Sequence, residues 1–239
     1  ELDDVRRCAL DRRIDSGALS ELAQIAVAAV DVLDIDGLKE GFDFVFVIGG
    51  DGTILKTARF YAKYQTPIFG INLGRLGFLS QSSKEDIEKS VDEILEGHFI
   101  IEDRIMLQSG DFSALNDFVI KGQDMGRTSR FSLKINDKFV CDYLADGIIV
   151  STPTGSTAYG LSAGGPVLSP SLNVFEIVPI CPHTLNARPI VVPDCEKITV
   201  STDLNSKYVL STDGQELYEI SSDIVIEKSL YTAKLALLK

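Results

Sequence analysis

Hydrophobic residues form an unbroken run at positions 44–48, and the glycine-rich stretch 49–53 follows directly. The next segment places Ile54, Leu55, Ala58, Tyr61 and Ala62 at helical spacing on one face. We therefore predict strands over residues 43–48 and 67–73 and an amphipathic helix over residues 54–64. The order strand, glycine turn, helix, strand is that of a βαβ unit, whose strands are parallel and joined by a right-handed crossover.

The segments on either side of this unit have helical patterns. Residues 1–40 predict one or two helices, and residues 19–32 are rich in Ala, Leu and Val. A doubly wound domain normally opens with a strand, and the pattern indicates none here. Beyond the βαβ unit, Ser82-Ser83-Lys84-Glu85 has the pattern of a capping box, which predicts a helix that ends at Gly97.

The residue pattern of the chain changes near residue 99, where short runs rich in β-branched residues begin to alternate with turn residues. These runs lie at residues 99–107, 115–120, 131–135, 147–151, 174–180, 189–192, 197–201, 207–210, 224–226 and 231–237. Such spacing favours an all-β domain of sandwich type. We therefore expect an α/β domain with a parallel, Rossmann-like sheet over residues 1–98 and an all-β, sandwich-like domain over residues 99–239. Whether the last strand returns to the first domain stays open.

Composition narrows the class of protein. The chain has 239 residues, is 45% hydrophobic and carries a formal net charge of -12, which indicates a folded protein and argues against nonspecific binding of nucleic acid. No apolar run approaches the length of a membrane span, and the first residues lack the pattern of a signal peptide. We expect a cytoplasmic protein with neither membrane nor nucleic-acid partners.

The cysteines give no sign of a metal centre. Cys8, Cys141, Cys181 and Cys195 form no CxxC pair and have no metal-ligand spacing. Free thiols in a reducing compartment are therefore expected, and no protein residue is assigned as a metal ligand.

The first stretch with chemical character is Gly49-Gly50-Asp51-Gly52-Thr53. Glycines at a strand-to-helix turn let the backbone approach a ligand, and the positive end of the helix attracts an anion, so the stretch predicts a phosphate or nucleotide site. A turn that serves only packing is the alternative. Asp51 argues against that alternative, because a carboxylate beside a phosphate repels it unless it binds a cation or accepts a proton from a hydroxyl group.

The second stretch is the hydroxyl-rich loop STPTGSTAY at residues 151–159. Its many neutral donors and acceptors around Tyr159 suit ribose, adenine and phosphate better than an apolar substrate. Upstream, Asn116 has the groups to read an adenine edge or a ribose hydroxyl, and Asp117 to accept ribose hydroxyl hydrogens, although the pair alone also fits an ordinary turn. Near the C-terminus an Asp-Gly pair predicts a hairpin turn, with Gln215 as a polar group beside it.

Taken in order, these motifs resemble the motif set of the NAD kinase family, from about residue 40 to the end. The resemblance is carried by residues 49–53, 72–79, 116–117, 146–159, 182–189 and 213–215. The GGDGT turn is shared with diacylglycerol, sphingosine and phosphofructokinase-type kinases, so the loop at residues 151–159 is the more specific element. Asp117 departs from the family pattern, because many members carry Glu there.

The resemblance implies an activity and a set of site residues. It implies an α/β domain and a β domain, ATP and a divalent cation such as Mg²⁺, phosphoryl transfer to the 2′-hydroxyl of the adenosine ribose of NAD, and a homodimer or homotetramer. It assigns the catalytic role to Asp51 and the phosphate turn to Gly49, Gly50, Gly52 and Thr53. It assigns the adenosine half of NAD to Phe78, Asn116, Asp117, Thr157, Ala158 and Tyr159, and the second nucleotide region to Asp146, Thr154, Ser162 and Gln215.

The position of Asp51 at the start of a helix bears on its role. The helix end favours the charged carboxylate, which makes it a weaker base. We expect Asp51 to orient the 2′-hydroxyl and to take its proton late in the transfer.

Two other functions fit parts of the sequence. A diacylglycerol-type lipid kinase would share the GGDGT turn but needs an apolar acceptor channel, whereas residues 151–159 predict a polar one. A non-catalytic dinucleotide sensor would bind NAD without turnover, and such a protein has no use for Asp51. A protein with interaction functions alone leaves the ordered motif set unexplained.

Overall fold

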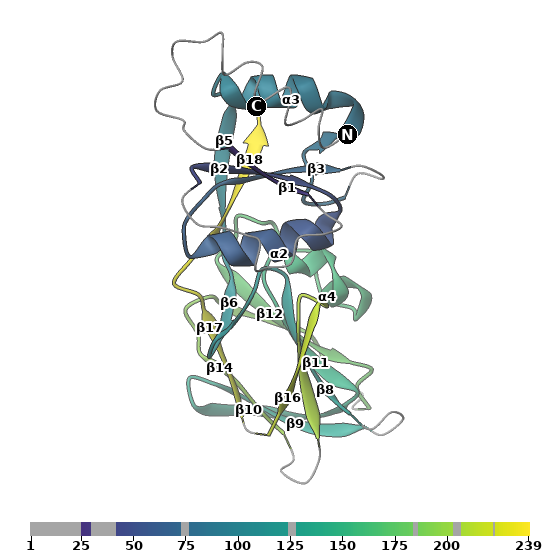
Figure 1. Ribbon diagram of the computed structural model, residues 1–239. Coiled ribbons are helices and arrows are strands. Elements are labelled where there is room, and N and C mark those ends of the chain that lie inside the picture. The colour runs from purple at the N-terminus through teal and green to yellow at the C-terminus, as the bar shows by residue number, and fades with distance from the viewer. Residues whose placement is uncertain are drawn as a thin grey trace. The chain divides into compact units, whose positions relative to one another are not determined.

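The computed structural model describes residues 25–29, 42–72, 77–123, 128–183, 186–202, 207–221 and 223–239. The chain divides into two compact units (Figure 1): the first runs to Asp103 and also takes in Thr232–Lys239, and the second is Arg104–Tyr231. No helix within the described ranges is long and apolar enough to cross a membrane.

The first unit is built on one sheet with the strand order β1-β2-β3-β18-β5. Its strands are β1 (Ile25–Ala29), β2 (Phe44–Ile48), β3 (Ile68–Asn72), β18 (Ala233–Leu238) and β5 (Phe99–Arg104), and the short β4 (Ser82–Ser83) pairs with β3. β2 is parallel to both β1 and β3, and β18 is parallel to β3. The helix α2 (Asp51–Ala62) connects β2 to β3, so the predicted βαβ unit is confirmed.

Helices cover both faces of this sheet, α2 on one side and α3 (Ile87–Leu95) on the other (Figure 1). Alternate residues of β2 and β3 pack with Val91 and Ile94 of α3. On the opposite face Gly70 lies against α2, where a Cβ atom would stand 2.5 Å from Cδ1 of Ile54. Burial on both faces explains why β2 is apolar without alternation.

The first strand corrects the sequence prediction. The pattern predicts a helix over residues 19–32 and no opening strand, but β1 pairs in parallel with β2, from Ile25 opposite Phe44 to Ala29 opposite Ile48. A short apolar run fits a strand and a buried helix equally well by periodicity. Pairing with β2 decides between them and overrides the helix propensity of Ala. The remaining predictions for residues 1–40 lie outside the described residues.

The entry to α3 also differs from the prediction, while its end does not. No side chain caps the helix; the Ser83 hydroxyl donates instead to the Asp86 carboxylate at 2.8 Å, and the 3₁₀ turn η2 (Lys84–Asp86) leads into α3. The capping-box prediction is therefore wrong in its hydrogen bonding. Gly97 ends the helix as predicted, with a left-handed φ of 78° and its N–H on the Ile94 carbonyl oxygen.

The second unit consists of two six-stranded sheets whose assigned pairs are all antiparallel. One contains, in order, β10 (Lys138–Ala145), β9 (Ser129–Ile135), β14 (Ile198–Thr202), β17 (Ile224–Lys228), β6 (Leu107–Ser109) and β7 (Phe112–Ala114). The other, here called the β8 sheet, contains β13 (Ile190–Pro193), β12 (Val174–Ile180), β11 (Gly147–Ser151), β8 (Asp117–Gly122), β15 (Tyr208–Thr212) and β16 (Glu216–Ile220).

The two sheets share one apolar core. It includes Phe131, Leu133, Ile198 and Val200 from one sheet and Phe118, Ile120, Ile148, Val150, Phe175 and Ile177 from the other. This shared core confirms the predicted all-β, sandwich-like domain. The first unit confirms the predicted α/β domain, with parallel pairs among β1, β2, β3 and β18 in a sheet that is mixed as a whole.

Three strands of the second unit lie outside the predicted runs, namely β7, β10 and β16, although the predicted Asp-Gly hairpin turn implies a strand at the position of β16. All three lie at the edge of their sheets, where one side of the strand is unpaired. Along β10 only Tyr143 and Ala145 are buried, so its hydrophobic signal is weak. β7 pairs with β6 in a tight hairpin, and each of these two strands has only three residues, too few to show an alternating pattern.

Candidate functional site

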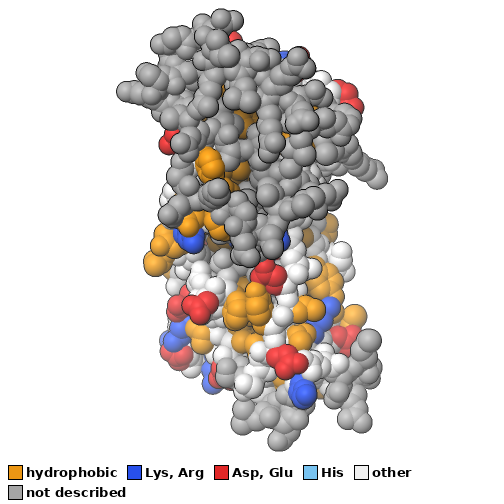
Figure 2. All heavy atoms as spheres, viewed as in Figure 1, with side chains coloured by type: hydrophobic (Ala, Val, Ile, Leu, Met, Phe, Trp, Pro, Cys, Tyr) orange, Lys and Arg blue, Asp and Glu red, His pale blue; other side chains and the backbone are white. Residues whose placement is uncertain are grey.

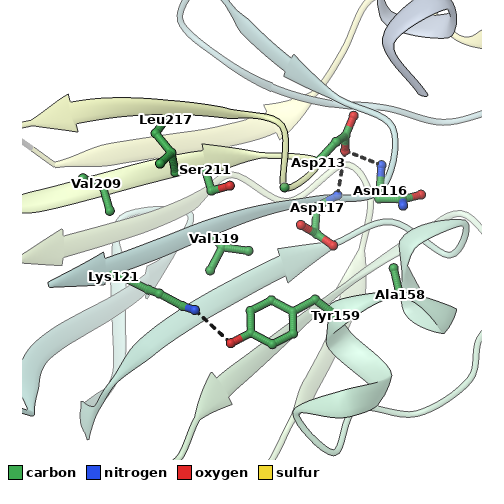
Figure 3. A pocket seen from close by; sticks show the side chains of 11 residues that line it. Asn116, Asp117, Val119, Lys121, Ala158, Tyr159, Val209, Ser211, Asp213 and Leu217 are labelled. Atoms are coloured by element: carbon green, nitrogen blue, oxygen red, sulfur yellow. Dashed lines mark hydrogen bonds between the residues drawn. The ribbon is translucent and has the colours of Figure 1, made fainter. Parts of the chain in front are cut away.

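The outer face of the β8 sheet, opposite the core, carries polar groups. Successive residues of a strand point to opposite faces, and Phe118 and Ile120 of β8 point into the core. Asp117, Val119 and Lys121 therefore lie on the outer face, as Figure 3 shows. A carboxyl group and an ammonium group thus flank an apolar side chain on one strand.

The turn between β15 and β16 fixes the start of β8. Asp213 and Gly214 both have left-handed φ values, 50° and 67°, and lie at the centre of the turn, which the Gln215 N–H closes by donating to the Thr212 carbonyl oxygen at 2.9 Å. The Asp213 carboxylate accepts hydrogen bonds from the backbone N–H groups of Leu115 (3.2 Å), Asn116 (2.8 Å) and Asp117 (3.1 Å). The predicted hairpin turn is confirmed, and its Asp side chain also holds Asn116 and Asp117 in place.

The hydroxyl-rich loop packs on the same short segment. The Thr152 N–H donates to the Asn116 carbonyl oxygen at 2.9 Å, and the Thr152 hydroxyl donates to the Leu115 carbonyl oxygen at 2.6 Å. Gly155 lies so close to the backbone of Asn116 that a Cβ atom at residue 155 would stand 2.1 Å from the Asn116 carbonyl oxygen. Only glycine fits at this position, so the loop packs directly on the start of β8.

The loop continues into the 3₁₀ turn η3 (Gly155–Thr157) and the short helix α4 (Tyr159–Ser162). A small apolar cluster of Val119, Ile149, Val178 and Ile180 on the outer face of the sheet packs against Tyr159 and Ala163. These contacts hold α4 over the sheet.

A cavity of about 360 Å³ lies between α4 and the strands, within the size range of small-molecule sites. Its lining, drawn in Figure 3, consists of Asn116, Asp117, Val119, Lys121, Ala158, Tyr159, Val209, Ser211, Asp213, Gly214 and Leu217. The cavity therefore combines apolar walls with amide, hydroxyl, carboxyl and ammonium groups.

Lys121 and Tyr159 are joined across this cavity (Figure 3). The Lys121 ammonium group donates to the Tyr159 hydroxyl at 2.8 Å and lies 4.7 Å from the centre of its ring. The two contacts hold a positive charge beside the aromatic ring.

The charges of the site are unusual. Burial raises the pKa of Asp117 to about 7, and the neighbouring Asp213 carboxylate adds to this effect. The side-chain oxygen of Asn116 is buried and has no hydrogen-bond partner among the described residues. Buried polar atoms are nearly always hydrogen-bonded, so an acceptor left over at a cavity indicates a place for a donor from a ligand.

The glycine turn of the first unit has its own geometry. Gly50 precedes α2 in an extended conformation, and Asp51 is the first residue of the helix. The Asp51 carboxylate accepts the backbone N–H groups of Phe78 (2.9 Å) and Leu79 (3.2 Å). A Cβ atom at Gly77 would stand 2.2 Å from Oδ1 of Asp51, so this close approach requires glycine.

The expected site residues fall into three groups. Asn116, Asp117, Ala158 and Tyr159 line the cavity, whereas Gly49, Gly50, Asp51, Gly52, Thr53 and the 78%-exposed Phe78 belong to the first unit. Thr154, which accepts a hydrogen bond from Arg104, and Thr157, Asp146, Ser162 and Gln215 are not among the residues that line the cavity.

The sequence interpretation assigned no binding role to seven of the lining residues: Val119, Lys121, Val209, Ser211, Asp213, Gly214 and Leu217. The alternation along β8 places Val119 and Lys121 on the face of Asp117, and this signal was available in the sequence. The others reach the cavity through the pairing of β15 with β8, which the sequence does not encode locally, and through the hairpin of β15 with β16, whose Asp-Gly turn the sequence does predict.

The comparisons with known proteins agree over both units. The family model for the ATP-NAD kinase N-terminal domain matches residues 30–99, and that for the ATP-NAD kinase C-terminal domain matches residues 115–238. The chain is 46% identical over 209 residues to an NAD kinase of Clostridium botulinum, covering 82% of this chain and 74% of the relative. It is 43% identical over 223 residues to an NAD kinase of Carboxydothermus hydrogenoformans, covering 88% and 79%.

Solved structures lead to the same family. The crystal structure of an NAD kinase from Archaeoglobus fulgidus in complex with ATP has a TM-score of 0.73 and 34% sequence identity, and covers 83% of this chain and 78% of that one. The crystal structure of yeast NADH kinase complexed with NADH has a TM-score of 0.74 and 28% sequence identity, and the match covers 82% of this chain and 62% of that one. On the family models and these relatives, the chain belongs to the NAD kinase family.

Proposed function

We propose that this chain transfers the γ-phosphoryl group of ATP to the 2′-hydroxyl of the adenosine ribose of NAD, giving NADP and ADP. The observation that carries the proposal is the start of β8, where the Asn116 amide and the Asp117 carboxyl group line a cavity that also offers an aromatic ring and an ammonium group. Relatives that are named NAD kinase and that are similar to most of this chain support the same reaction.

The proposed place of NAD in this cavity uses three side chains. The Asn116 oxygen, which has no partner among the described residues, accepts from the adenine amino group or a ribose hydroxyl. Asp117 in its ionised form accepts a ribose hydroxyl hydrogen. The Tyr159 ring offers a surface for stacking.

We add Lys121 to this set as the group that meets the diphosphate of NAD. Its ammonium group is the only cation among the residues that line the cavity, where Asp117 and Asp213 are acidic. An anionic ligand needs a local positive charge there, and the contact with Tyr159 keeps the ammonium group in place.

In the proposed mechanism Asp51 orients the nucleophile. Each of its carboxylate oxygens accepts one backbone N–H, from Phe78 or Leu79, and each retains a lone pair for a hydroxyl hydrogen. Phosphoryl transfer depends mainly on alignment and charge stabilisation, so a fixed acceptor is sufficient. The proton of the 2′-hydroxyl then passes to Asp51 late in the reaction.

We propose that the divalent cation binds together with ATP, mainly through the phosphates of ATP. Among the described residues no group of three His, Cys, Asp or Glu side chains could hold a metal ion. Mg²⁺ commonly keeps several waters and binds substrate phosphates with one or two carboxylates, and Asp51 is the carboxylate at the glycine turn. When bound, the cation would neutralise charge on the phosphates.

A coupled assay tests the function. Purified protein with ATP, NAD and Mg²⁺ should produce NADP, measured with an NADP-specific dehydrogenase, and EDTA should stop turnover. NAD binding measured by calorimetry should survive the EDTA. Binding of NAD without NADP formation would favour the sensor, and phosphorylation of diacylglycerol with no NADP would favour the lipid kinase.

The proposal includes a cytoplasmic location and a homo-oligomer. Cys141, Cys181 and Cys195 are free thiols, as expected in a reducing compartment. Hydrophobic side chains lie among charged ones on the face that Figure 2 draws, and the edge strand β10 exposes Phe139 and Leu144. Sedimentation at several concentrations would measure the oligomeric state, and a monomer at all of them would contradict this part.

A further inference from the structure

Glu176 of β12 is a buried carboxyl group that the proposed reaction does not use. Its exposed fraction is 0%, and neither of its oxygens has a hydrogen-bond partner among the described residues. Burying a carboxyl group without partners is costly, and such groups concentrate at functional sites. Its position therefore needs an explanation.

Two glycines make room for this carboxyl group. A Cβ atom at Gly160 would stand 2.3 Å from one Glu176 oxygen, and a Cβ atom at Gly165 would stand 3.1 Å from the other. Gly160 follows Tyr159 in α4, and the Gly165 N–H donates to the Gly160 carbonyl oxygen at 2.9 Å. Glu176 thus contacts the segment that lines the cavity.

Strand register places Glu176 in one row with Asp117. Ser151 of β11 pairs with Asp117 of β8 on one side and with Glu176 of β12 on the other. Directly paired residues on neighbouring strands point to the same face, so two carboxyl groups flank Ser151 on the outer face. Burial raises the pKa of Glu176 to about 7, and the Asp117 carboxylate adds to the rise.

Other charged or titratable groups face this row from the elements around it. They are Asp213 at the β15–β16 turn, which accepts three backbone N–H groups, Lys121 further along β8, and Tyr159 on α4. Lys121 donates to the Tyr159 hydroxyl, and no hydrogen bond among the described residues joins it to Glu176. Asp117 is therefore the group with which Glu176 interacts most directly.

We propose that Glu176 is a positioning residue of the dinucleotide site: its carboxyl group, in one row with Asp117, opposes the ionisation of Asp117 and so sets the pH at which Asp117 accepts hydrogen bonds from a ribose. The inference rests on the proposed function of this cavity. Two carboxylates in one buried row oppose each other's ionisation, so the pair keeps one proton until the pH exceeds neutrality. Replacing Glu176 by a neutral residue removes the competing charge, and Asp117 then ionises at lower pH.

The test is the pH dependence of KM for NAD between pH 5.5 and 9 at saturating ATP. In the wild type KM falls as Asp117 ionises, and in Glu176→Gln we expect the midpoint of this fall to move to lower pH by about one unit. The control Glu219→Gln changes an exposed carboxylate on β16 and should follow the wild type. A KM altered by the same factor at every pH, with an unmoved midpoint, would mean that Glu176 only supports the fold.

A second measurement separates this inference from the proposed function. The carboxyl ¹³C signal of Asp117 is assigned by its loss in Asp117→Asn and is then titrated in the unliganded wild type and in Glu176→Leu. The Leu variant removes the same carboxyl group and replaces the Gln variant in this test if that variant does not fold. We expect a lower titration midpoint in the variant, and equal midpoints would refute the electrostatic interaction between the two carboxyl groups. This result does not depend on turnover, so absence of NADP formation would count against the proposed function alone.

Discussion

Asp51 combines two contacts in one carboxylate, because it fixes the backbone at Phe78 and Leu79 and is proposed to accept the 2′-hydroxyl hydrogen. In Asp51→Asn the carboxamide keeps the size of the side chain but replaces one acceptor oxygen by a donor. We expect kcat to fall about 10²–10⁴-fold, the usual range for loss of a proton acceptor, while KM for NAD changes little. Steady-state kinetics measure both. The control Asp43→Asn alters an exposed side chain, and a near-normal kcat in Asp51→Asn would remove Asp51 from the mechanism.

Lys121 makes a second prediction at the scale of one residue. In Lys121→Met the aliphatic stem remains and the charge is lost, so KM for NAD should rise about tenfold, in line with loss of one charge-assisted hydrogen bond. Binding of adenosine, which lacks the diphosphate, should be unchanged when measured by calorimetry. Lys138→Met on the exposed part of β10 is the matched control. Equal weakening of NAD and adenosine binding would place Lys121 outside the diphosphate contact.

At the scale of elements, the loop at residues 151–159 and the start of β8 act as one piece. Gly155 lies against the Asn116 backbone, where an added Cβ atom would stand 2.1 Å from the carbonyl oxygen. In Gly155→Ala the two segments must move apart, at a cost of about 1–3 kcal/mol in the free energy of unfolding. KM for NAD should rise together with the loss of stability, because the displaced backbone carries Asn116 and Asp117 away from their positions at the cavity. Chemical denaturation and kinetics check the two effects.

The control for this loop is Val167→Ala, which shortens an exposed side chain (65% exposed) just beyond α4. It should leave stability and KM close to those of the wild type. If Gly155→Ala lowered stability but left KM unchanged, the loop would have a structural role without positioning the start of β8.

At the scale of the whole molecule, the stability of the fold depends on pH through two kinds of carboxyl group, those whose pKa rises on folding and those whose pKa falls. The two kinds act in opposite directions. The pKa values of Asp117 and Glu176 rise to about 7, so the folded state binds more protons than the unfolded one between their ordinary values and 7. Their contribution is complete below about pH 4 and is lost as the pH rises through 7. Asp103 is of the other kind, because its hydrogen bond with Lys234 lowers its pKa.

We therefore predict that Asp117→Asn/Glu176→Gln reduces the fall in stability that accompanies a rise in pH through 7. Between pH 6 and 8 the wild type should lose on the order of 1–3 kcal/mol more than the double variant, given about 1.4 kcal/mol for each pKa unit. Thermal unfolding of the unliganded proteins at a series of pH values measures the difference. Parallel profiles for the two proteins would show that these carboxyl groups titrate alike in the folded and unfolded states.

The sequence by itself determined the elements whose signals are local. The apolar run of β2, the glycine turn and the amphipathic face of α2 are adjacent in the chain, so their pattern alone predicted the βαβ unit. The same holds for the Asp-Gly hairpin turn at Asp213, whose two left-handed residues suit that pair. The order of motifs likewise pointed to the family before any contact was known.

Only the tertiary structure decided which residues share a surface. Strand β1 depends on pairing with β2, and edge strands such as β10 carry too weak a pattern to predict. Asp213 and Glu176 reach the face of the β8 sheet that holds Asp117 through register between strands that are distant in sequence. A shift of one residue in that register would turn each side chain to the opposite face, and no local pattern specifies it. The charges that tune Asp117 therefore follow from strand pairing, whereas the presence of Asp117 in the motif follows from the sequence.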